Sequence, residues 1–92
     1  MAAIPMPATA PRRRWHALEE ILAERDALAA ELAVRSTKAA VREAHHAWVA
    51  ARSEAERRAA AARYRQLVGD FRSAERAADH AWRRFCRILD DR

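Results

Sequence analysis

The pattern of apolar and polar residues predicts a long helix at the end of the chain, over about 54–90. With Tyr64 at position a of a heptad, each a and d position through Ile88 is apolar or alanine: Tyr64, Leu67, Phe71, Ala74, Ala78, Ala81, Phe85 and Ile88. Such a run over more than three heptads is typical of a helix that packs along one side against another helix. Val68, Trp82 and Leu89 widen the same side at position e. We therefore expect an apolar seam between Tyr64 and Leu89.

A second helix is predicted over about 12–35. Its large apolar residues are spaced by three, four or seven, which places them on one face of a helix: Trp15, Leu18, Ile21, Leu22, Leu28 and Leu32. Pro11 suits the first turn of this helix, and no helix breaker follows it. We call these six residues the apolar stripe. It should be covered either by the seam of the later helix or by another copy of the chain.

Residues 37–52 form either a connecting helix or an extension of one of the two longer helices. Ser36–Thr37 could cap a new helix, and Ser53 has Glu56 three residues later, which is the spacing of a capping box. Gly69–Asp70 could also end a helix. The heptad register continues across that pair, however, and this favours a continuous or slightly kinked helix there.

Composition supports an all-α fold with a thin core. The 92 residues include 25 alanines and 17 arginines, both strong helix formers, and only one glycine. Alanine supplies about half of the apolar residues, so few large side chains remain to build a globular core. We expect an extended or disordered arm over 1–11, where the three prolines lie, and one helical domain over 12–92. The expected architecture is a helical hairpin or coiled coil of two or three helices that assembles as an oligomer.

The formal net charge of +5 resides mostly in the second half of the chain. In the heptad frame the arginines of the later helix point away from its seam: Arg58, Arg65, Arg72, Arg76, Arg83 and Arg87. A row of guanidinium groups attracts the phosphates of nucleic acid. The alternative is an ordinary solvated face, because a helix with one buried side must place its charges on the other.

A second basic cluster, Arg12, Arg13 and Arg14, precedes Trp15. The indole of Trp15 could stack on a base, and three cations at a helix N-terminus oppose the helix dipole, which suggests a role beyond folding. A solvated helix end is the alternative. We predict that these three arginines contribute to the nucleic-acid-binding residues.

Tryptophans in so alanine-rich a chain usually anchor a core or an interface. Trp82 flanks the seam, which suggests contact with a third helix or a second subunit. The residues expected at an interface are Trp48, Tyr64, Leu67, Val68, Phe71, Trp82, Phe85, Ile88 and Leu89.

No motif predicts catalysis, a cofactor or a metal site. With Gly69 as the only glycine, the chain has no glycine-rich phosphate loop. Glu43 and His46 have the Glu-x-x-His spacing of a di-metal bundle, but the second copy that such a site needs is missing. No apolar run is long enough to cross a membrane, and the N-terminus has no apolar core of a secretory signal. The single cysteine, Cys86, fits a reducing cytoplasm.

The sequence therefore predicts a cytoplasmic, non-enzymatic helical module that forms homo-oligomers and binds nucleic acid with little sequence specificity. In size, helical-hairpin organisation and basic charge it resembles the oligomerisation core of small terminase subunits, the phage proteins that bring DNA to a packaging motor. No sequence motif of that family is present, and the chain has no room for its separate helix-turn-helix domain. The alternative function is a protein–protein adaptor or inhibitor, such as a small phage or mobile-element protein that docks on a larger complex through its helical face.

Overall fold

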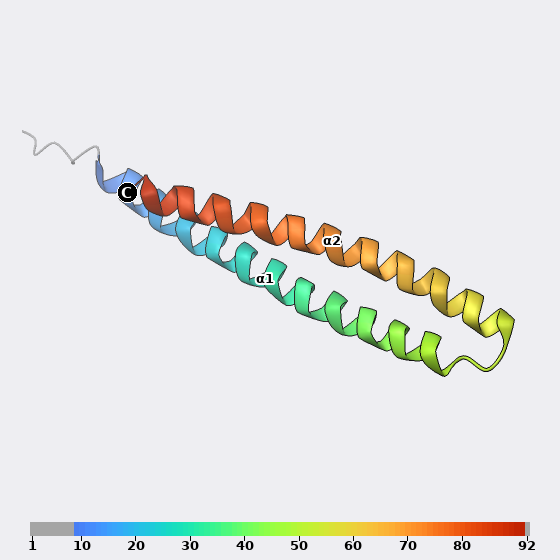
Figure 1. Ribbon diagram of the computed structural model, residues 1–92. Coiled ribbons are helices and arrows are strands. Elements are labelled where there is room, and N and C mark those ends of the chain that lie inside the picture. Colours follow the sequence, from blue (N-terminus) through green and yellow to red (C-terminus); the bar gives the residue numbers. More distant parts are fainter. Residues whose placement is uncertain (1–8, 92) are drawn as a thin grey trace, which may run out of the picture.

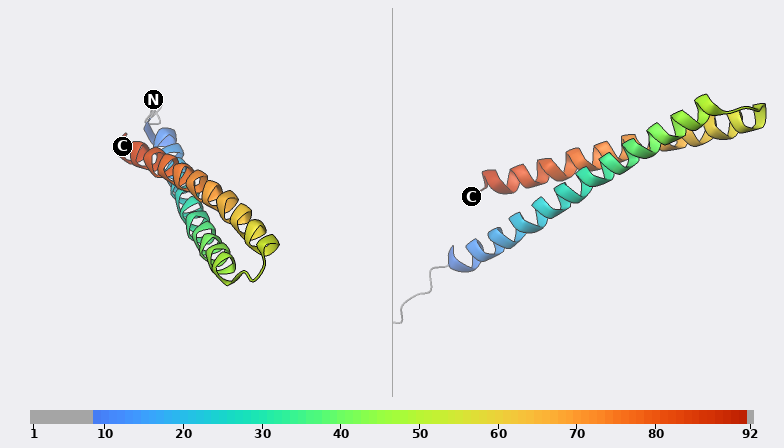
Figure 2. Two further views of the ribbon diagram at one scale, coloured as in Figure 1. Left: turned by 45° about the vertical axis from the view of Figure 1, so that its right-hand side comes forward. Right: turned by 90° about the horizontal axis from the view of Figure 1, so that it is seen from below.

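The protein is a hairpin of two long antiparallel helices (Figure 1). The computed structural model describes residues 9–91, and their side chains from Trp15 onward. Helix α1 spans Thr9–Ala50 and helix α2 spans Glu54–Asp90, and the first turns of α1 extend beyond the end of α2. The molecule measures 87 × 14 × 13 Å. The two further views show the helices side by side and crossing along their length (Figure 2).

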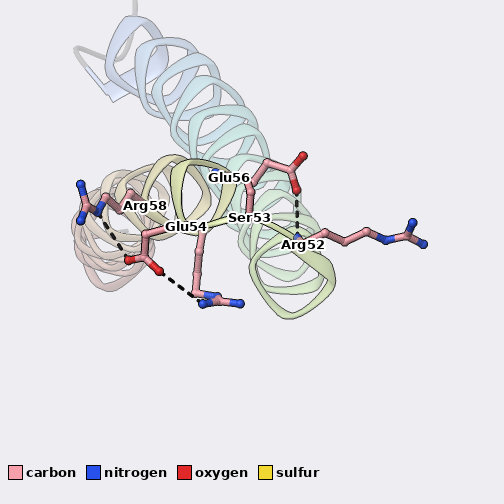
Figure 3. A network of polar contacts seen from close by, with 6 residues as sticks. Arg52, Ser53, Glu54, Glu56 and Arg58 are labelled. Atoms are coloured by element: carbon pink, nitrogen blue, oxygen red, sulfur yellow. Dashed lines mark hydrogen bonds and ion pairs between the residues drawn. The ribbon is translucent and has the colours of Figure 1, made fainter.

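Helix α2 begins at Ser53 because this residue forms a capping box. The hydroxyl of Ser53 accepts a hydrogen bond from the Glu56 amide at 3.1 Å, as the sequence predicts. The Glu56 carboxylate reaches back and accepts from the amide of Arg52 at 2.9 Å (Figure 3). Glu54 and Glu56 also place negative charge in the first turn, where the helix dipole favours it. Only 51–53 lie between the helices, so the chain reverses sharply.

Helix α1 runs through Ser36–Thr37 without interruption, so residues 37–52 extend the first helix and do not form a third one. The Thr37 hydroxyl lies 2.8 Å from the carbonyl oxygen of Ala33 and donates back into its own helix, which removes its tendency to cap a new one. Helix α2 is likewise continuous across Gly69–Asp70. Residues 9–11 belong to the first turn of α1, and the rest of the arm expected over 1–11 lies outside the described residues.

The seam of α2 faces α1, as its heptad pattern predicts. Every a and d residue from Tyr64 to Ile88 is buried or half-buried, and so are Val68, Trp82 and Leu89 at position e. The residues at b, c, f and g between Tyr64 and Ile88 are exposed. Because α1 is the only other described element, the burial of the seam comes from the contact between the two helices.

The face that α1 turns to α2 is not the apolar stripe. It consists of smaller residues that repeat every three and four positions: Ala23, Ala27, Ala30, Val34, Thr37, Val41 and Ala44. Ala27 is 0% exposed, whereas Trp15, Ile21 and Leu32 of the stripe remain 65%, 57% and 62% exposed. Small side chains on α1 allow the bulkier residues of α2 to approach its backbone closely, so the seam of α2 does not cover the stripe.

Contacts between rings fix the register near the loop. Trp48 of α1 and Tyr64 of α2 have ring centroids 5.6 Å apart, and His45 lies 6.0 Å from the same tyrosine ring. Towards the other end, the guanidinium of Arg84 lies 4.0 Å from the Asp26 carboxylate. In this antiparallel register the bulky Phe85 and Ile88 stand level with Ala27 and Ala23.

Gly69 lowers the stability of α2 as a helix, and no contact in the hairpin requires a glycine at this position. It is helical, without a positive φ, and a Cβ added there would meet no atom within 4 Å. Replacing Gly69 with alanine should therefore raise the free energy of unfolding by about 0.5–1 kcal/mol, since alanine loses less backbone entropy in a helix. Urea denaturation followed by circular dichroism measures this change. The matched control Ala62→Gly, at the same heptad position, should lower it by a similar amount; a destabilised Gly69→Ala variant would contradict the prediction.

Candidate nucleic-acid interface

The side of α2 that points away from α1 carries most of the cationic excess of the molecule. We define the arginine face as the b, c and f positions of α2 from Arg58 to Arg87. It holds six exposed arginines, which are those predicted from the heptad: Arg58, Arg65, Arg72, Arg76, Arg83 and Arg87. Asp79 is its only acidic residue. The arginine face therefore has a formal charge of +5, which equals that of the whole chain, so the residues outside this face are neutral overall.

Two of the six arginines are paired with acids on their own helix. Arg58 lies 3.5 Å from Glu54, and Arg83 lies 3.1 Å from Asp79, with more than half of each side chain exposed. Exposed pairs of this kind contribute little stability, about 0–1 kcal/mol, and separate easily when a stronger anion approaches.

The arginines in the middle of the arginine face are the most available to an anionic ligand. Among the described residues, no acidic group lies within ion-pair distance of Arg65, Arg72 or Arg76, and Arg76 makes a hydrogen bond to the hydroxyl of Ser73 at 3.1 Å. Positions 65 and 72 are two helical turns apart, about 10.5 Å along the axis. Gly69 lies between them at position f with open space above it, so a partner could approach the backbone of α2 there.

Two other acids of α2 lie nearer to α1, at the rim of the seam. Asp70 and Glu75 occupy positions g and e, and the Asp70 carboxylate accepts a hydrogen bond from Gln66 at 3.3 Å. On the facing helix, Asp26 pairs with Arg84 across the hairpin. The two signs of charge are thus separated, with a mixed rim between the helices and a cationic outer face.

The sequence prediction omitted Arg63 and Arg84, which are also exposed. Both occupy position g, and the same heptad frame could have placed them at the rim. Arg84 is directed to Asp26 and is therefore less available to a ligand. The backbone of the predicted cluster Arg12, Arg13 and Arg14 lies in the first turns of α1, which extend beyond the end of α2, while the side chains of these residues lie outside the described part.

The residues predicted at an interface lie along the contact between α1 and α2 of one chain. Trp48 and Tyr64 meet near the loop, and the rings of Trp82 and Phe85 pack edge to face with centroids 5.8 Å apart. None of the large side chains among the described residues is fully buried, since only alanines fall in the buried class. Contact between chains through these residues remains a prediction.

The described residues contain no group of three or more His, Cys, Asp or Glu side chains that could hold a metal ion. Neither described helix has an apolar stretch long enough to span a bilayer. No protein-family model, curated protein or solved structure matches the chain. The functional argument therefore depends on the charge and packing of the hairpin itself.

Proposed function

We propose that this chain is a non-enzymatic, cytoplasmic helical module that binds nucleic acid through the arginine face of α2. The observation that carries the proposal is the charge separation: six exposed arginines and one acid share the outer face, while the rest of the chain is neutral overall. A role as a DNA-associated accessory protein, of the kind found in phage DNA packaging, agrees with this distribution of charge.

Binding of this kind is directed at phosphates. Long, exposed arginine side chains on a straight helix can follow a phosphate backbone and release its counterions, which makes affinity strongly dependent on salt. Reading of bases in a groove needs several side chains held in fixed directions, and the arginines in the middle of the face are not held by acidic partners. We therefore expect little preference between sequences.

The test compares two variants that lose the same charge from different faces. Arg65→Gln/Arg72→Gln/Arg76→Gln should weaken binding to a mixed-sequence duplex at least tenfold at low salt and reduce the slope of log affinity against log salt by about two to three. The control, Arg35→Gln/Lys38→Gln/Arg42→Gln on exposed positions of α1, should change affinity less than threefold. Fluorescence anisotropy over a salt series measures both. Equal losses in the two variants, or no binding by the unmodified protein, would overturn the proposal.

A second function, adaptor or inhibitor of a larger protein complex, is supported by one observation. The apolar stripe of α1 remains exposed on the hairpin, and exposed apolar surface of this extent usually marks a contact with protein. If the folded protein does not bind a duplex at low salt, this function is the better account.

A further inference from the structure

The apolar stripe occupies the side of α1 opposite to α2. Numbered from the seam of α1, with Ala27 at position a, its six residues all fall at b, c or f, where a two-helix coiled coil normally carries polar residues. Their exposed fractions are 46–65%. We propose that this stripe is the surface on which a second copy of the chain packs, antiparallel and back to back, to form a four-helix dimer.

The area of the stripe agrees with this partner. With the usual areas of fully exposed side chains, the observed fractions leave about 600 Å² of these six residues uncovered in each copy. Two stripes packed together would bury about 1,200 Å² in total, at the lower end of specific protein interfaces. A hairpin whose buried residues are all alanine also needs further apolar contact more than most folds do.

The charges around the stripe exclude an anionic partner. Although Arg12, Arg13 and Arg14 precede it, the segment 15–32 contains five acids and one arginine and has a formal charge of −4. It would repel both the phosphates of nucleic acid and an anionic lipid surface. The acids lie beside the seam, where Asp26 meets Arg84, and they leave the stripe itself almost uncharged. An apolar, self-complementary face of this kind suits an isologous contact between two copies.

The residues that follow the stripe determine the orientation. Beyond Leu32 the same side of α1 carries Arg35, Arg42, Glu43 and His46, all exposed. In a parallel dimer each of these would face its own counterpart, and two guanidinium groups brought together repel each other. In an antiparallel dimer the middle of one stripe packs on the middle of the other. The polar part of each α1 beyond Leu32 then extends past the contact, and the two polar parts extend in opposite directions.

The test of self-association compares two carboxylates on the same side of α1. Leu22→Asp lies inside the stripe, where Leu22 is 47% exposed, whereas Val49→Asp lies near the loop, where Val49 is 74% exposed. Sedimentation equilibrium of the full chain should give a dimer that Leu22→Asp dissociates, with the dissociation constant raised at least tenfold, while Val49→Asp changes it less than twofold. Circular dichroism checks that both variants keep their helices.

Spin labels measure the orientation. A label on Ala39→Cys in a Cys86→Ser background sits about 15 residues from the middle of the stripe, so antiparallel pairing gives a label separation of about 45 Å. Parallel pairing would place the labels within about 20 Å of each other and would overturn the proposed orientation. The proposal itself would be overturned if the protein stays monomeric at about 100 μM, a concentration well above the dissociation constants of specific interfaces. A dimer that Leu22→Asp does not weaken would overturn it too. These readouts involve no nucleic acid, so their outcome is independent of duplex binding.

Discussion

Replacing Ala27 by leucine should lower the free energy of unfolding of the hairpin by about 2–3 kcal/mol, a large part of the total stability of a domain of this size. Ala27 is fully buried, and in the antiparallel register it stands level with Phe85 of α2. An isobutyl group has no space there unless the helices separate, and separation would uncover the neighbouring seam on both sides. Thermal and urea denaturation followed by circular dichroism measure the loss.

The matched control is Ala39→Leu, which makes the same change at an exposed position of α1. It should alter the free energy of unfolding by less than 0.5 kcal/mol, because leucine and alanine differ little in helix propensity. Combining Ala27→Leu with Phe85→Ala should recover part of the loss, since the smaller residue on α2 makes room for the larger one on α1. The contrary result would be an Ala27→Leu variant with an unchanged free energy of unfolding, or strictly additive effects in the double mutant. Either would show that close packing around Ala27 does not stabilise the hairpin.

The two helices differ in how well the sequence predicts them. In α2 the large residues face the partner helix, so a search for apolar periodicity finds both the helix and its buried side. In α1 the large residues point outward and alanines form the seam, so the same search identifies the helix but does not find the face that contacts α2. The size of an apolar residue indicates which face prefers to leave water, and it does not indicate which partner covers that face.

The helix boundaries show a similar contrast. Ser53 and Glu56 carry a local signal that needs only neighbouring residues, and the structure shows the expected cap. Serine and threonine often cap helices, as Ser36 and Thr37 could. The Thr37 hydroxyl instead donates a hydrogen bond within α1, and the helix continues through both residues. A capping residue ends a helix only where the packing also allows the chain to turn.

The arginine face could be predicted because it follows from the register of α2 alone. Which arginines are engaged could be predicted only in part, since Arg83 meets an acid four residues earlier whereas Arg84 meets Asp26 on the other helix. The first contact is visible in sequence spacing. The second depends on how the two helices are aligned, and no local pattern encodes that alignment.

The back-to-back dimer and the arginine face together predict that the protein bridges two nucleic-acid duplexes. Each arginine face points away from its own α1, and in the proposed dimer the two α1 helices would form the centre. The order of helices across the dimer is therefore α2, α1, α1 and α2, with cationic faces on opposite outer sides, separated by three helix spacings of about 8–10 Å each. One straight duplex cannot contact both faces at once.

Bridging can be measured by the capture of a labelled duplex on beads that carry a second, immobilised duplex. The unmodified protein should capture it, and Leu22→Asp should reduce capture at least tenfold while still binding a single duplex in anisotropy, although more weakly because avidity is lost. Arg65→Gln/Arg72→Gln/Arg76→Gln should lose both signals, which separates failure of the arginine face from failure of the dimer. Capture that persists in Leu22→Asp would mean that the two duplexes are joined through a contact other than the stripe. The stripe would then be free to bind a different protein, as an adaptor requires.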